Sequence, residues 1–233
     1  MSDENYDSNN KKDLKRTFND RKRTNILKDA EQQTILFLVA RMPGYITPDI
    51  LTAIGVAGSG LVLASFILGY YIDIHFLLLG ISGLAINWFG DSLDGRLAYF
   101  RNIPRKWYGF ALDVIMDWTS TVLIGMGYMV YADDFYELLA FLFVVLYGWA
   151  MIISQLRYKI TDQYTIDSGQ FGPTEIRVII CLILLAEVLF PGSISTCAMI
   201  ICVLLFIVNL IDTRQLLKLA DEKDLEIKRA KGL

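Results

Sequence analysis

The sequence predicts an all-α integral membrane protein with six transmembrane helices and an N-terminal interfacial amphipathic helix. Hydrophobic residues make up 54% of the 233 residues, above the average for soluble domains, and the mean hydropathy is +0.42. The charged residues gather at the two ends of the chain, and the middle is largely apolar. With a net charge of -3, this segregation gives nucleic-acid binding no support.

Three regions follow from this pattern. We expect a cytoplasmic N-terminal segment over 1–43, a six-helix membrane domain over 44–212 and a cytoplasmic tail over 213–233. The run TILFLVARMP, which ends at Pro43, is too short to cross a bilayer and favours a helix lying in the membrane interface. An irregular apolar linker is the alternative. The tail mixes both charge signs with leucines at helical spacing, which indicates a helical extension.

Helices that cross a bilayer need about 17–25 predominantly apolar residues. Six runs of the sequence meet this requirement, near 48–71, 74–95, 108–131, 135–157, 174–191 and 193–212. Short connections between them predict that successive helices run antiparallel.

The positions of Lys and Arg predict the orientation. All 22 of them precede the first span, follow the last span, or lie around the connections after the second and fourth spans. The remaining connections carry acidic residues and His75 but no Lys or Arg. The positive-inside rule therefore places both termini in the cytoplasm. Glu187 lies near the opposite, outer end of the fifth span, and its position there favours a structural or snorkelling role over a catalytic one.

Four aspartates lie close to the connection between the second and third spans: Asp91, Asp94, Asp113 and Asp117. The members of each pair are three or four residues apart, so each pair shares one face of its helix. Antiparallel spans bring both pairs to a similar depth, where carboxylates repel one another and hard divalent cations relieve the repulsion. We therefore expect a cytoplasmic site for Mg²⁺ or Mn²⁺ that holds two ions. Helix capping or topology alone is the competing explanation.

This spacing resembles the signature of the CDP-alcohol phosphotransferase family, D-x2-D-G-x2-A-R-x8-G-x3-D-x3-D. Seven of its eight fixed residues are present in order: Asp91, Asp94, Gly95, Ala98, Gly109, Asp113 and Asp117. The stretch ITPDILTAIG, 46–55, is also similar to the opening of the family's first span. Two features depart from the pattern, because Tyr99 replaces the family arginine and the interval to Gly109 is one residue longer. Either Arg96 or Arg101 is then expected to supply the missing charge.

The resemblance implies a phospholipid-synthesising enzyme that moves a substituted phosphate from a CDP-linked donor to an alcohol and releases CMP. It implies metal ligation by Asp91, Asp94 and Asp113, while Asp117 serves as general base and as a further metal ligand. The small residues Gly95, Ala98 and Gly109 would lie along the CDP pocket, with close helix packing as their other explanation. A homodimer is implied as well.

The substrates stay open at this stage. We favour CDP-diacylglycerol as donor with a small polar alcohol of the inositol phosphate, glycerol phosphate or serine type; the alternative is CDP-choline or CDP-ethanolamine with a lipid acceptor. Four residues at the cytoplasmic ends of the fourth and fifth spans are candidates for the acceptor: Gln155, Arg157, Glu175 and Arg177. The two arginines either bind a phosphate, pair with Glu175, or anchor helix ends in lipid headgroups.

An ion-coupled transporter is the rival from another class, since intramembrane carboxylates also mark ion pathways. A transporter predicts acidic groups spread along a pathway, often with internal repeats. Here the acidic groups cluster on one face, which favours the enzyme.

Overall fold

The computed structural model describes residues 28–161 and 173–230, and all regular structure in these two ranges is helical. Residues 1–27, 162–172 and 231–233 lie outside the described part, and with them lies most of the predicted N-terminal segment. The predicted all-α class is confirmed for the described residues. The long helices are α2 (Lys28–Ala40), α3 (Pro48–Tyr71), α4 (Leu77–Phe100), α5 (Lys106–Tyr131), α6 (Glu137–Thr161), α7 (Pro173–Leu189) and α8 (Ser193–Ala230), with 3-10 turns at Ile74–Phe76 and Asp134–Tyr136.

Five of these helices are long and apolar enough to cross a membrane, so the chain is a multi-pass membrane protein. They are α3, α4 with its preceding turn, α5, α6 and α8. Large apolar side chains such as Ile115, Ile152 and Leu204 project outward from them, as expected of helices that face lipid. Helix α7 coincides with the predicted fifth span but has only 17 residues.

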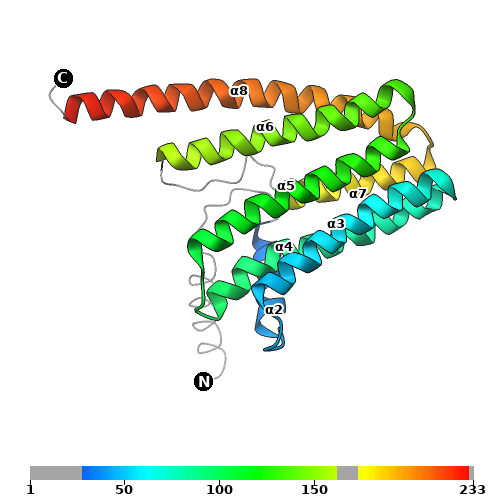
Figure 1. Cartoon of the computed structure of the whole chain (residues 1–233), viewed down its shortest axis with the longest axis horizontal. Coiled ribbons are helices and arrows are strands. Elements are labelled where there is room, and N and C mark those ends of the chain that lie inside the picture. Colours follow the sequence, from blue (N-terminus) through cyan, green and yellow to red (C-terminus); the bar gives the residue numbers. More distant parts are fainter. Residues whose placement is uncertain (1–27, 162–172, 231–233) are drawn as a thin grey trace.

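The helices from α3 to α8 lie roughly parallel and antiparallel to one another (Figure 1). Helix α3 packs against both α4 and α5, whereas α6 packs against α8 on the other side of the bundle. Because successive helices reverse direction, the connection between α4 and α5 lies at the same end of the bundle as the end of α6 and the start of α7 (Figure 1). The predicted antiparallel arrangement of the second and third spans is therefore confirmed.

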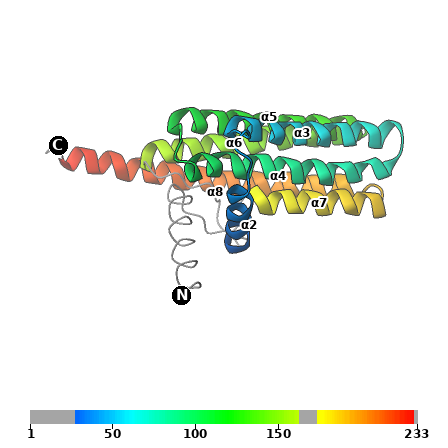
Figure 2. The same cartoon turned by 90° about the horizontal axis from the view of Figure 1, so that it is seen from below.

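Helix α2 crosses the bundle at a steep angle, as the view in Figure 2 shows. Its buried side chains Ile35 and Val39 form a cluster with Leu93 and Leu97 of α4. The Thr174 hydroxyl at the start of α7 also donates to Glu31 on α2, at 2.8 Å. A helix is therefore present where the interfacial helix was predicted, and it contacts α4 and α7. Its location in a membrane interface stays a prediction.

Glycines let α3 and α4 approach each other at the level of their backbones. A Cβ atom added to Gly58 would lie 2.5 Å from the Asn87 nitrogen and 2.6 Å from the Gly83 oxygen. Farther along the same contact, a Cβ on Gly90 would collide with the backbone of Gly55. Small residues at helix contacts are common in membrane proteins for this reason. The contact places the second half of α4, with Asp91, directly against α3.

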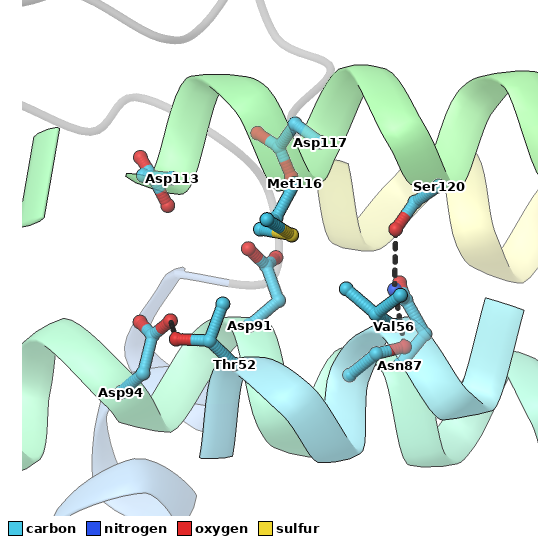
Figure 3. Close-up of a pocket in the computed structure, with 10 residues that line it drawn as sticks. Thr52, Val56, Asn87, Asp91, Asp94, Asp113, Met116, Asp117 and Ser120 are labelled. Atoms are coloured by element: carbon cyan, nitrogen blue, oxygen red, sulfur yellow. Dashed lines mark hydrogen bonds between the residues drawn. The ribbon is translucent and has the colours of Figure 1, made fainter. Parts of the chain in front are cut away.

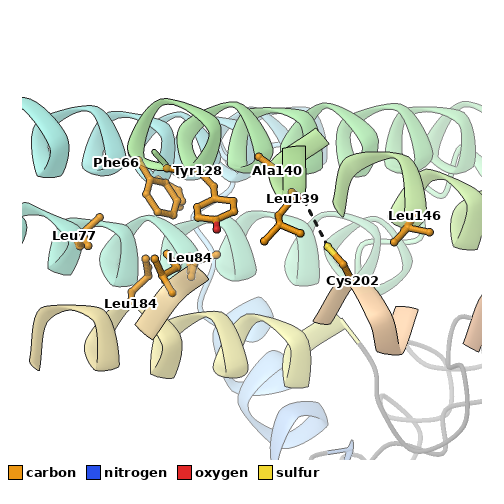
Figure 4. Close-up of a cluster of buried hydrophobic side chains, with 12 residues drawn as sticks. Phe66, Leu77, Leu84, Tyr128, Leu139, Ala140, Leu146, Leu184 and Cys202 are labelled. Carbon is orange, nitrogen blue, oxygen red and sulfur yellow. Dashed lines mark hydrogen bonds between the residues drawn. The ribbon is translucent and has the colours of Figure 1, made fainter. Parts of the chain in front are cut away.

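A second group of side chains fills the other end of the bundle (Figure 4). Phe66 of α3, Tyr128 of α5 and Leu184 of α7 converge there, together with residues of α4, α6 and α8. Cys202 is part of this core, where it packs as a small buried hydrophobe.

Helix α8 continues through the predicted end of the sixth span as one helix of 38 residues. Two contacts hold this region against α6: Arg157 pairs with Asp212 at 3.6 Å, and Lys223 donates to the Ile160 carbonyl. The Lys223 contact satisfies a carbonyl in the last turn of α6, where no intrahelical partner is available. The predicted helical extension is thus confirmed as far as Ala230.

Glu187 joins α7 to α8 at the end of the bundle away from the aspartates. Its side chain is only 2% exposed and accepts hydrogen bonds from the Tyr131 hydroxyl, the Gly192 and Ile194 backbone and the Ser193 hydroxyl. The carboxylate also lies at the N-terminus of α8, where the helix dipole favours negative charge. Glu187 has the structural role that the sequence favoured.

The glycine contact leads to a paired stability test. Gly58→Ala should destabilise the protein by about 1–3 kcal/mol, because the new methyl group meets backbone atoms that cannot rotate away. Gly60→Ala is the matched control on the same helix, since nothing lies within 4 Å of the added Cβ. Thermal unfolding in detergent should give a lower Tm for Gly58→Ala only. Equal Tm values for the two variants would contradict the close approach.

Candidate active site

The site lies where α3, α4 and α5 meet. Helix α4 ends in a turn in which Asn102 adopts a positive φ of 60°, a conformation that asparagine tolerates better than most residues. The chain then reverses, and α5 begins at Lys106. The extra residue of the motif falls in the interval that contains this turn, so each helix keeps its own aspartate spacing.

Three of the four aspartates come together. Asp91 of α4 and Asp113 and Asp117 of α5 each offer a carboxylate oxygen, and these oxygens all lie within 4.8 Å of one another. All three side chains are partly buried. The structure thus brings both helices' acidic faces to one place, as their spacing predicted. We call this group the aspartate triad.

Asp94 lines the same pocket but is turned toward α3 (Figure 3). Its Oδ2 accepts a hydrogen bond of 2.6 Å from the Thr52 hydroxyl, and its Oδ1 accepts one of 2.5 Å from the Gly95 backbone N–H. These contacts fix the orientation of the carboxylate at the edge of the triad.

The pocket between the helices has a volume of about 250 Å³, including its open mouth. Ten residues from three helices line it, and most of them have polar side chains: Thr52, Gly55, Val56, Asn87, Asp91, Asp94, Asp113, Met116, Asp117 and Ser120. The carboxylate and hydroxyl oxygens among them are of the kind that binds hard divalent cations.

Arg177 reaches into the site from α7. Its Nη2 donates to Asp91 Oδ2 at 2.5 Å, and its Nε donates to Asn87 Oδ1 at 2.7 Å. The sequence placed this residue among the acceptor candidates at the mouth of the cavity. The structure places its guanidinium against a member of the aspartate triad instead.

Asn87 connects the site to the helices around it. The side chain is 5% exposed, and its Nδ2 lies near the Gly55 carbonyl at 3.1 Å and the Ser59 and Ser120 hydroxyls at 2.9 and 3.4 Å. With the contact to Arg177, this one amide links α3, α4, α5 and α7.

Asn87 and Thr52 were not identified as site residues from the sequence. Asn87 lies one helical turn before Asp91, and an amide within an apolar span is a usable signal because it needs a partner in the protein. Thr52 lies in the ITPDILTAIG stretch, but nothing in its local pattern distinguishes it from a threonine that bonds only to its own helix.

The other basic candidates lie elsewhere. Arg101 donates to the carbonyls of Met42, Pro43 and Ile46, so it secures the loop between α2 and α3. Arg96 is 4% exposed on α4.

The four candidates for binding the acceptor also lie in different surroundings. Arg157 pairs with Asp212 of α8, Gln155 is partly buried on α6, and Glu175 is 7% exposed on α7. Arg177 is thus the candidate that the described contacts bring to the aspartate triad.

The two glycines of the motif are not at a close helix contact. A Cβ added to Gly95 or Gly109 would meet nothing within 4 Å, unlike one added to Gly58 or Gly90. Ala98 lies one turn after Gly95 and is half-buried. Close helix packing therefore does not account for the two motif glycines, and the open space beside them remains available to a ligand.

Comparison with protein-family models gave no match, and comparison with curated proteins gave none either.

The role of Asn87 can be tested by stability. Asn87→Leu should lower the free energy of unfolding by about 1–3 kcal/mol. The substitution breaks several interhelical hydrogen bonds and removes the oxygen that accepts from Arg177 Nε. Asn209→Leu is the control: Asn209 is fully buried on α8, donates to Leu146 and has an Oδ1 without a partner. Thermal unfolding should show a clearly larger loss for Asn87→Leu. A larger loss for Asn209→Leu would contradict the central role of Asn87.

Proposed function

We propose that the protein is a CDP-alcohol phosphotransferase of phospholipid synthesis, which moves a substituted phosphate from a CDP-linked donor to an alcohol and releases CMP. The observation that carries this proposal is the convergence of Asp91, Asp113 and Asp117 from two helices, at the spacing of the family signature. Neither helix alone brings the three together, so a motif spread over 27 residues, 91–117, becomes one chemical site.

The residues present fit a divalent cation. Their donors are carboxylate oxygens within 4.8 Å of one another, which is the donor set that Mg²⁺ and Mn²⁺ prefer. Asp91, Asp113 and Asp117 would hold the metal, with Asp94 beside them, and two ions are the expected number. When bound, the metal would neutralise the diphosphate and the charge that develops on the leaving CMP.

The chain's own residues have separate tasks in this proposal. Asp117 lies in the triad but deepest along α5, and we assign it the proton of the acceptor hydroxyl. Thr52 holds Asp94 in one orientation, which keeps that carboxylate directed along the pocket edge. The open space at Gly95 and Gly109 would admit the CDP group close to the helix backbones.

Helix α7 serves as the fifth of six spans in this proposal, in addition to the five helices that are long enough by themselves. Both α6 and α8 run from the far end of the bundle toward the end with the basic connections (Figure 1). Two membrane spans with the same direction require a crossing between them, and α7 is the helix that connects them. With α7 included, both termini and the site lie on the cytoplasmic side. The homodimer implied by the resemblance remains a prediction.

The substrate class we favour is CDP-diacylglycerol with a small polar alcohol of the inositol phosphate, glycerol phosphate or serine type. The experiment is CMP release by the purified protein with Mg²⁺, in which CDP-diacylglycerol, CDP-choline and CDP-ethanolamine are each combined with polar and lipid acceptors. CMP formed only from CDP-diacylglycerol and one polar alcohol supports the proposal. Release from CDP-choline or CDP-ethanolamine with a lipid acceptor would keep the reaction but reverse the substrate assignment. No CMP from any pair would contradict the proposed enzyme.

Two substitutions test the assigned aspartates. Asp117→Asn should lower CMP release by about 100-fold or more, because an amide cannot accept the proton of the hydroxyl. Asp94→Asn should also lower it strongly, since the amide presents one weaker oxygen and a nitrogen to the pocket. Asp224→Asn is the control, because Asp224 is exposed on the helical extension of α8. Turnover that survives both site substitutions would show the catalytic assignment to be wrong.

A further inference from the structure

Arg177 makes the closest described contact to the aspartate triad. Its guanidinium lies 2.5 Å from Asp91 Oδ2, and the two side chains are only 14% and 23% exposed. The Coulomb attraction between two charges that are this well shielded from water is stronger than that between charges on a protein surface. One oxygen of a predicted metal ligand is therefore already engaged by a positive charge of the protein itself.

Hydrogen bonds to side chains that are themselves fixed hold the Arg177 guanidinium in position. Asn87 accepts from Nε at 2.7 Å and is itself held by the Gly55 carbonyl and the Ser59 hydroxyl of α3. These partners belong to the glycine contact between α3 and α4, not to the aspartates. The position of Arg177 is thus set by the rigid part of the bundle, with Nη2 directed at Asp91.

We propose that Arg177 is an internal counter-ion of Asp91 and competes with the divalent cation for this carboxylate, an inference that rests on the metal site of the proposed function. A guanidinium on Asp91 Oδ2 occupies a lone pair of this carboxylate and offsets its negative charge, so it makes Asp91 a weaker metal ligand. Arginine also keeps its charge at every accessible pH, so the competition cannot be relieved by deprotonation. Arg177 stabilises the metal-free site and weakens the binding of the metal.

The counter-ion role differs from two other roles that an arginine can have at a metal site. A residue that merely orients Asp91 for the metal would strengthen metal binding, so its removal would weaken it. A residue that only binds a substrate phosphate would leave metal affinity unchanged when substrate is absent. The three roles therefore predict three different results in one binding measurement without substrate.

The experiment is Mn²⁺ binding to the full-length protein in detergent, without any substrate, followed by the free-Mn²⁺ EPR signal. Arg177→Gln and Arg177→Met should each bind Mn²⁺ about tenfold more tightly than the wild type, because the competing charge is gone. Arg177→Lys keeps the charge and should stay within about threefold of the wild type. Arg157→Gln is the matched control, since its partner Asp212 is not part of the triad, and its affinity should not change. Unchanged or weaker binding by folded Arg177→Gln and Arg177→Met would overturn the inference.

A second measurement uses the wild type, so the test does not depend on the folding of the neutral variants. The Nε–Hε resonance of Arg177, assigned by its absence in Arg177→Lys, should shift on Mg²⁺ titration with the midpoint of metal binding. A resonance that stays unchanged at saturating Mg²⁺ would overturn the inference.

Failure of the inference and failure of the proposed function remain distinguishable. If the wild type binds Mn²⁺ but the neutral variants bind it no better, the metal site stands and the counter-ion role falls. If neither the wild type nor the neutral variants bind Mn²⁺, both the metal site and the counter-ion role are wrong. Binding that becomes measurable only in the neutral variants supports both.

Discussion

The backbone contact between α3 and α4 is the constraint on which the rest of the structure depends. Glycines on both helices remove the side chains that would otherwise keep the two helices apart. At this short separation, the Asn87 amide reaches the Gly55 carbonyl, and the Thr52 hydroxyl reaches Asp94. Larger residues at the contact would move α4 outward and separate these groups. The same contact therefore stabilises the bundle and builds the floor of the candidate active site.

The acidic side chains at the two ends of the bundle have different surroundings. Glu187 is surrounded by four hydrogen-bond donors, three of them from the turn and helix start that follow it, and it is almost inaccessible. Such a carboxylate is satisfied by the protein and has a structural role. The aspartate triad instead borders an open pocket, where three carboxylates lie within a few ångströms of one another. The carboxylates repel one another, and the Arg177 guanidinium on Asp91 offsets part of this repulsion.

Much of the fold could be predicted from the sequence because membrane helices carry a strong local signal. The apolar runs located the long helices to within a few residues, although α4 and α6 continue beyond their predicted ends to Phe100 and Thr161. Those extra turns contain polar residues, and a hydropathy boundary does not detect a helix that continues past the apolar part. After the sixth span, predicted to end at residue 212, the predicted helical extension is present, because α8 continues to Ala230.

The roles of the arginines could not be predicted with the same certainty. The sequence made Arg101 a candidate for the charge of the missing family arginine and Arg177 a candidate for the acceptor. One is held by the carbonyls of the loop between α2 and α3, and the other lies on Asp91 and Asn87. A long side chain can reach groups in several directions, so its partner depends on which helices lie within that reach.

The sequence by itself determined the helical class, the apolar spans and the pairing of aspartates on two helical faces. These features depend on composition and on the 3.6-residue period, which act within one helix. Only the tertiary structure decided that three aspartates meet while Asp94 turns to Thr52, that Asn87 links four helices, and that Arg177 lies on Asp91. These contacts join residues up to 90 positions apart, as between Asn87 and Arg177, and they form because glycine contacts set how closely the helices pack. No local period in the sequence encodes that separation.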